Sequence, residues 1–224
     1  MSDLSNPIWS SLSTRHAHLA RVHGRAMRYP EEIAPFAAMD APSAEAEQDL
    51  LDLVSIGETV CLLNILPASL DGWEIRKEFD AYQYVWEGEM PSPDPMAMLL
   101  GPEDLGAMLD LTALVYPAYF RKGTAELGDY YGFFEGEQLC AMAGIRMAMT
   151  GFQEIGAICT HPDHRGRGLA SRLTNHLIHL ICTQSDTPFL HTEHDNKAAQ
   201  SIYEKLGFRR RGILALRLLQ RVAS

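Results

Sequence analysis

The sequence of 224 residues lacks several features that define other classes of protein. No run approaches the ~18 consecutive apolar residues that a membrane span needs. The N-terminus is polar and interrupted by charges and histidines, unlike a secretory signal. The four cysteines lie far apart without a CxxC pair, which excludes a disulfide scaffold and indicates reduced thiols in a cytoplasmic protein. With 46% hydrophobic residues, the chain can build the core of one large or two small domains.

The net negative charge comes entirely from the first part of the chain. Residues 1–95 carry 6 Lys or Arg against 16 Asp or Glu, whereas residues 96–224 carry 13 of each. A net charge of −10 repels a phosphate backbone, so no nucleic-acid partner is expected. Several arginines gather near residues 165–172, and a basic loop inside an acidic protein favours a small polyanionic ligand.

A proline-rich segment at residues 90–95 divides the chain, because three prolines in five residues exclude both helix and central strand. We therefore expect an N-terminal α/β lobe of unknown role at residues 1–95 and a second domain at residues 96–224. Hydrophobic periodicity predicts helices at residues 43–54, from 101 onward, at 169–181 and at 196–206. It predicts strands at residues 59–66, 73–79, 130–134, 139–149, 153–160, 188–192 and 213–219.

The most informative segment is residues 158–170, which combines a strand, a glycine-rich basic loop and the start of a helix. Free amides at a helix start, together with the helix dipole, form an anion site. Gly166 and Gly168 let the backbone approach a phosphate closely, and Arg165 and Arg167 add positive charge. The pattern favours a pyrophosphate as the ligand.

Three other interpretations fit the residues less well. Gly166-x-Gly168-x-x-Ser171 with Asp186 downstream partly matches a dinucleotide fingerprint, but its third position is Ser and no series of βαβ units follows. HxxH occurs three times, yet no cysteine or acid has zinc-finger spacing around these pairs, so no metal is expected. A P-loop is excluded, because no GK[ST] follows the glycines.

Two motifs in the right order resemble those of the GNAT superfamily of N-acetyltransferases. The first is Arg165-x-x-Gly168-x-Ala170 after an apolar strand, which resembles the acyl-CoA signature. The second is an Asn opening a helix, a Tyr seven residues later and then Leu-Gly-Phe, found at residues 196–208. The sequence around these motifs is similar to the C-terminal part of glycine N-acyltransferases. The resemblance covers about residues 98–217. The resemblance implies a mixed central sheet flanked by helices, with the N-terminal lobe as a degenerate companion.

The resemblance also implies which residues hold acetyl-CoA, the expected co-substrate. The preceding strand would contact the pantetheine arm, the loop amides would hold the pyrophosphate, and Asn196 and Tyr203 would lie near the arm and the thioester sulfur. The complete implied set is Ile158, Cys159, Thr160, Arg165, Gly166, Arg167, Gly168, Leu169, Ala170, Ser171, Asn196 and Tyr203.

The implied reaction is transfer of an acetyl or short acyl group to a primary amine by direct attack in a ternary complex. Tyr203 is the expected acid, because a phenol can donate to the departing sulfur. Glu154 is one candidate base, with a pKa raised by partial burial in a cleft. His191 is the other, at a position where protein N-terminal acetyltransferases of the superfamily carry Glu, which argues against a protein N-terminus as acceptor. Cys159 is expected to pack rather than react.

The acceptor remains open at this stage, as a small-molecule or peptide amine. The acidic first part is compatible with a cationic acceptor such as a polyamine or an aminoglycoside, although a solvated acidic surface is the commoner explanation. The alternative function is a catalytically inactive acyl-CoA-binding regulatory module. No membrane partner is expected, and the assembly, with a homodimer as one candidate, is left open.

Overall fold

The computed structural model describes residues 4–116 and 120–223. Its helices are α1 (Pro7–Leu12), α2 (Ala44–Leu53), α3 (Leu105–Val115), α4 (Leu169–Thr183) and α5 (Lys197–Lys205). Its strands are β1 (Arg21–His23), β2 (Ala26–Arg28), β3 (Ala37–Met39), β4 (Thr59–Leu63), β5 (Trp73–Trp86), β6 (Met98–Leu99), β7 (Tyr130–Glu135), β8 (Gln138–Met149), β9 (Phe152–Thr160), β10 (Thr187–Glu193) and β11 (Phe208–Arg221). Short 3-10 turns occur at Ala17–Leu19, Pro102–Asp104, Thr124–Leu127 and Pro162–His164.

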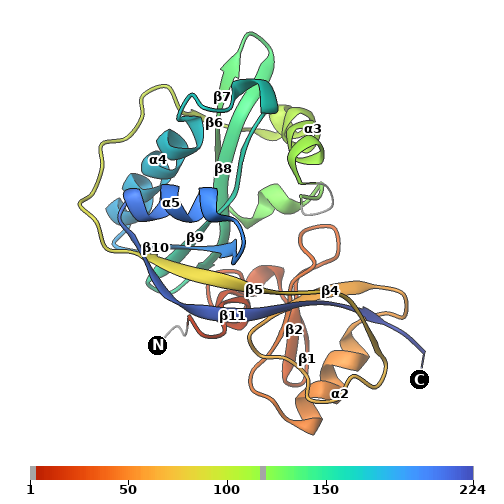
Figure 1. The fold of residues 1–224 in the computed structure, drawn as a ribbon. Helices are drawn as coiled ribbons and strands as arrows, with labels where there is room; N and C mark the ends of the chain where they lie inside the picture. The colour runs from red at the N-terminus through yellow and green to blue at the C-terminus, as the bar shows by residue number, and fades with distance from the viewer. Residues whose placement is uncertain (1–3, 117–119, 224) are drawn as a thin grey trace.

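The core of the molecule is an eight-stranded mixed sheet in the order β4-β11-β5-β10-β9-β8-β7-β6. The pair β9–β10 is parallel, and the other neighbours are antiparallel. Helix α4 packs on one face of β8 and β9, and α3 packs on the opposite face (Figure 1). The predicted mixed α/β fold with flanking helices is therefore confirmed.

Local sequence explains most element boundaries. Ser43 caps α2 by accepting a hydrogen bond from the Ala46 amide, and two glutamates lie in its first turn, where the helix dipole favours negative charge. The strands β5 and β11 are much longer than predicted, because they pair with each other along almost their whole length. This pairing extends the strands into segments that show no clear alternation of apolar and polar residues. The short α1 and the three-stranded sheet β1-β2-β3 were not predicted, since three-residue strands carry no measurable period.

Strands from both sides of the proline-rich segment lie in the same sheet. The strands β4 and β5 precede the segment, and β5 lies between β10 and β11, which follow it (Figure 1). The segment itself has no regular structure and lies against α4. There Asp94 pairs with Arg172, and the Asp94 amide donates to His176 Nδ1. The division into domains at residue 95 stays a prediction, and the large sheet depends on both parts of the chain.

The parallel pair β9–β10 opens within the sheet. Among the described residues its ladder joins only Phe152–Glu154 to Thr187–Phe189. Beyond this point β10 continues on β5, from Leu190 to Glu193, while β9 continues on β8. A bulge in β9 accompanies the divergence, because Ala157 and Ile158 together stand opposite the single residue Ala143. Ala157 has a φ of 51°, which is uncommon for a residue with a side chain.

Candidate active site

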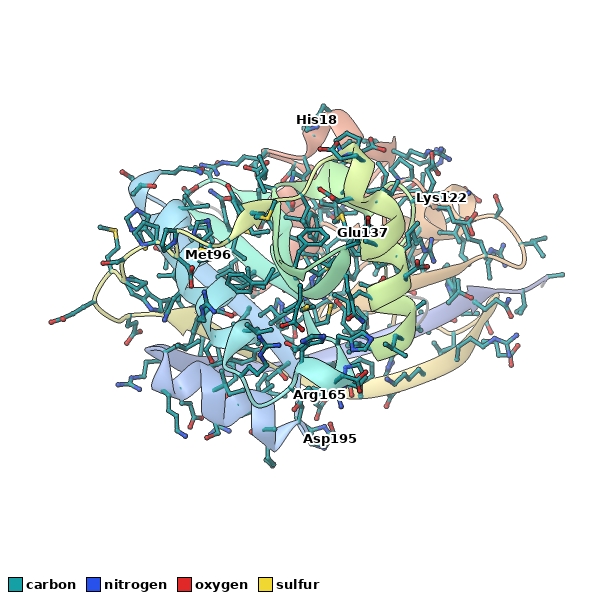
Figure 2. All side chains as sticks on the ribbon, turned by 90° about the horizontal axis from the view of Figure 1, so that it is seen from above. His18, Met96, Lys122, Glu137, Arg165 and Asp195 are labelled. Carbon is teal, nitrogen blue, oxygen red and sulfur yellow. The ribbon has the colours of Figure 1, made fainter. Side chains whose placement is uncertain are left out.

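A cavity of about 660 Å³ lies where β9 and β10 part, between the end of β9, the start of α4 and one face of α5. We call it the large cavity. Its volume is within the usual range for small-molecule sites. Figure 2 shows Arg165, on the loop before α4, on the same side of the molecule as Asp195, which precedes the capping residue of α5. The strand, the loop and the two helices thus converge on one opening.

The loop before α4 has the backbone of an anion site. Gly166 and Gly168 have φ values of 76° and 74°, and a Cβ at either position would meet nothing within 4 Å. These glycines are therefore required by backbone conformation and not by crowding. No N–H of residues 166–168 donates to a backbone carbonyl in the described loops. The amides of Leu169, Ala170 and Ser171 likewise have no intrahelical acceptor, so residues 166–171 present free donors.

Helix α5 brings a polar residue and an aromatic residue to the same cavity. Asn196 caps α5 by accepting a hydrogen bond from the Ala199 amide, which fixes its side chain at the cavity wall. Tyr203 lies two turns later and is half-buried, with edge-to-face contacts to Tyr84 and Phe208. Burial raises the pKa of Tyr203 to about 12, so its phenol stays protonated at neutral pH.

The large cavity brings together eleven of the twelve residues predicted to bind acyl-CoA. The exception is Arg167, whose guanidinium donates to His164 Nδ1 and pairs with Glu135, and which does not itself line the cavity. Sequence reasoning missed further lining residues, namely Val115, His164, Thr174, Ala198, Ala199 and Ile202. Thr174 follows Ala170 by four residues on α4, so helical spacing is a signal that could have found it.

Glu154 and His191 do not line the large cavity. They belong to a polar row that crosses five neighbouring strands and is buried at Gln83 and Glu154. Arg146 donates to both carboxylate oxygens of Glu154, and His191 Nδ1 donates to Glu154 Oε1 at 2.6 Å. Gln83 Nε2 donates to His191 Nε2 at 3.0 Å, and Arg211 donates to Gln83 Oε1 at 2.9 Å. Both ring nitrogens of His191 are therefore engaged.

The expected rise in the pKa of Glu154 is wrong. The side chain is fully buried rather than partly buried in a cleft. Burial alone would raise its pKa, but the charge of Arg146 and the pairing with His191 outweigh burial and lower the pKa to about 2. Glu154 is thus a fixed carboxylate and a poor proton acceptor at neutral pH.

Replacing Glu154 with Gln should destabilise the fold by about 3 kcal/mol or more at pH 7, because it leaves Arg146 without its buried counter-charge. Since the folded pKa of Glu154 lies below its ordinary value of 4.5, this contribution is present above about pH 4.5 and is lost as the pH falls toward 2. Urea unfolding of both proteins at pH 7 and pH 3.5 measures the effect.

The matched control is Glu78→Gln, which removes a half-exposed carboxylate paired with Arg217. An exposed pair contributes up to ~1 kcal/mol, so this variant should unfold almost like the wild type. Equal losses in the two variants would contradict the role assigned to the buried pair.

The three HxxH pairs occupy different places and form no common centre among the described residues. His176 and His179 fasten the proline-rich segment to α4, the latter by donating to the Pro91 carbonyl. His161 and His164 both contact Gln138. One group of potential metal donors exists in the described chain, formed by Glu135, Cys140 and His164. The expectation of no metal remains a prediction.

Cys159 packs in the core as expected. It is buried with Met108, Met142 and other residues between α3 and the sheet. Burial raises the pKa of its thiol to about 12, which suppresses the nucleophilic thiolate at neutral pH.

Comparison with known proteins agrees with this arrangement. Residues 130–216 match the family described as FR47-like protein. A crystal structure from Novosphingobium aromaticivorans, assigned to the GNAT family of acetyltransferases, is 31% identical with a TM-score of 0.90. That alignment covers 98% of this chain and 99% of the other. A GCN5-related N-acetyltransferase from Kribbella flavida has a TM-score of 0.60 over 95% of this chain and 94% of its own, but at 16% identity it supports the fold alone.

A curated relative matches over a shorter segment. Mycothiol acetyltransferase of Streptomyces avermitilis is 36% identical over 85 residues, which are 36% of this chain and 28% of that protein's length.

The fold and the large cavity define an acyltransferase enzyme. The chain belongs to the GNAT family of N-acetyltransferases. Members of this family use acetyl-CoA as co-substrate, and the free amides and glycines of the loop fit its pyrophosphate. No helix in the described part of the chain is both long enough and apolar enough to span a membrane.

Proposed function

We propose that this chain transfers an acetyl group from acetyl-CoA directly to a primary amine, with both substrates bound together. The observation that carries the proposal is that Tyr203 and the anion-binding loop line one cavity, at the point where β9 and β10 diverge. The loop would hold the pyrophosphate, which leaves the pantetheine arm to extend along Ile158–Thr160 toward Tyr203.

The chemistry conserves all atoms without a covalent enzyme intermediate. The amine nitrogen attacks the thioester carbonyl carbon, the C–S bond breaks, and the departing sulfur ends with a proton released by the nitrogen. The bulge at Ala157 and Ile158 leaves backbone groups outside the regular ladder, where an amide can stabilise the oxyanion. The ordinary pKa of a thiol, about 8.5, lies well below the pKa of about 12 of Tyr203, so the phenol keeps its proton beside a thiolate. Tyr203 therefore stabilises the thiolate by donating a hydrogen bond.

Glu154 and His191 act in this proposal as positioning residues. Neither lines the large cavity, and each is engaged on every side by the polar row. Their role is to hold Arg146 and the diverging strands in place. The likeness to the C-terminal part of glycine N-acyltransferases remains a proposal about the subgroup. The cytoplasmic location is likewise proposed, with support from four free cysteines.

Initial-rate kinetics with a panel of primary amines tests the proposal. Direct transfer predicts intersecting double-reciprocal lines, release of one thiol per acetylated amine, and no mass increase of the protein after incubation with acetyl-CoA alone. An acetylated protein, with Cys159 as the obvious position, would contradict the ternary complex. Tight binding of acetyl-CoA without transfer to any amine would instead favour the inactive regulatory module.

A further inference from the structure

A second, smaller cavity lies beside the large one. It measures about 40 Å³ and is lined by Phe36, Tyr116, Tyr130, Arg146 and Ala157, among others. We call it the small cavity. Consecutive residues separate the two cavities, because Ala157 lines the small one and Ile158 the large one. In the same way, Val115 lines the large cavity and Tyr116 the small one. The two cavities therefore adjoin at Ala157–Ile158 and at Val115–Tyr116, next to the path proposed for the thioester.

The fold makes room for Arg146 at this position. A Cβ on Gly156 would lie 2.8 Å from Arg146 Cβ and 3.1 Å from Arg146 Nε, so the arginine side chain crosses β9 over a residue without a side chain. The guanidinium also lies over the Phe36 ring, at 5.6 Å from its centroid. Gly156 and Phe36 thus fix the direction of the side chain from both sides.

The buried ion pair exposes only its cation. The Glu154 side chain is 0% exposed, whereas that of Arg146 is 30% exposed. Glu154 accepts hydrogen bonds from Nε and Nη2 of Arg146, and Nη1 makes no hydrogen bond among the described residues. No Asp or Glu is among the described residues that line the small cavity. Its single charged wall is consequently positive, although the first part of the chain is strongly acidic.

We propose that Arg146 selects the acceptor by binding a carboxylate that accompanies its primary amine. This inference rests on the proposed function. A guanidinium edge matches the planar carboxylate, and a cavity of this volume accommodates a group of few atoms. A diamine would bring a second positive charge to this cavity, where the described lining offers aromatic walls and no carboxylate to pair with it. The structure therefore points away from polyamines and toward acidic amines as acceptors.

Matched acceptors test the inference directly. Each set contains an ω-amino acid, its amide and the diamine of the same length, for example 4-aminobutanoate, 4-aminobutanamide and 1,4-diaminobutane. Sets of several lengths cover the unknown distance between amine and carboxylate. We expect the KM of the best carboxylate to be at least 10-fold below that of its amide, and transfer to the diamine to be weaker still.

The test variant is the double substitution Arg146→Gln/Glu154→Gln, which removes both charges and leaves no unpaired buried ion. It should bring the KM values of acid and amide together, whereas the Kd of acetyl-CoA should stay within 3-fold. Gly156→Ala should weaken the preference in the same direction, because the added Cβ displaces Arg146. The control is Arg217→Gln/Glu78→Gln, an ion pair between β11 and β5 that lines neither cavity, which should keep the full preference.

Two outcomes would overturn the inference in distinguishable ways. Equal or better use of the amide or diamine by the wild type would overturn the role of Arg146 and leave amine acetylation standing. Failure to acetylate any member of the sets, despite acetyl-CoA binding, would overturn the proposed function and this inference together.

Discussion

Replacing Gly168 with glutamate should weaken acetyl-CoA binding by at least ~100-fold, equivalent to about 3 kcal/mol. Gly168 is the N-cap residue of α4 and has a φ of 74°, a conformation that residues with a side chain rarely adopt. The substitution strains this turn and tilts the free amides, and it also places a carboxylate beside the pyrophosphate. Calorimetric titration with acetyl-CoA measures the loss, with NAD as a comparator that should not bind to the wild type.

A second glycine separates backbone strain from loss of the site. Gly57 has a φ of 87°, and a Cβ there would meet nothing within 4 Å, so Gly57→Glu carries the same strain and the same added charge far from the large cavity. Its affinity for acetyl-CoA should equal that of the wild type. If both variants lose binding equally, or if Gly168→Glu binds normally, the loop does not hold the pyrophosphate.

The loop could be predicted from sequence because its determinants are local. A strand, two glycines and a helix start within eleven residues fix the direction of the amides, and the structure places Ile158, Gly166 and Ser171 on one cavity. The same holds for Asn196 and Tyr203, which lie on one face of α5 because they are seven residues, or two turns, apart.

The environment of Glu154 could not be predicted, because its partners come from other strands. Arg146 lies on β8 and His191 on β10, and only the register of three strands brings them together. The sequence shows a carboxylate on an apolar strand, which is equally consistent with an active-site base and a buried ion pair. The partner decides the sign of the pKa shift, so a prediction without Arg146 gave the wrong direction.

The length of β5 and β11 was missed for a related reason. Residues 80–86 and 208–212 carry a mixture of polar, charged and aromatic residues without strict alternation. In the structure each strand supplies the missing hydrogen-bond partners of the other, and Gln83 contributes to the polar row as well. Pairing within the sheet thus overrides the weak local preference of these segments.

The largest effect on turnover is expected for Tyr203→Phe. Removing the phenol hydroxyl deprives the departing sulfur of its hydrogen-bond donor, and the turnover number should fall about 100-fold, a loss typical of a transition-state donor. The ring itself remains, with its contacts to Tyr84 and Phe208, so the Kd of acetyl-CoA should stay within about 3-fold of the wild type. Steady-state rates at saturating acceptor, together with titration of acetyl-CoA, separate the two quantities.

The neighbouring tyrosine provides the control for this prediction. Tyr84 packs against Tyr203, but its hydroxyl donates to Glu204 and does not line the large cavity. Tyr84→Phe removes the same chemical group from a neighbouring ring, outside the large cavity, and should therefore retain most of the turnover number. The pKa of about 12 adds a second criterion, because the phenol of Tyr203 stays protonated as the pH rises from 7 to 10. The rate of the wild type should consequently show no alkaline loss in that range, and a fall centred near the ordinary tyrosine value of about 10 would contradict the assignment.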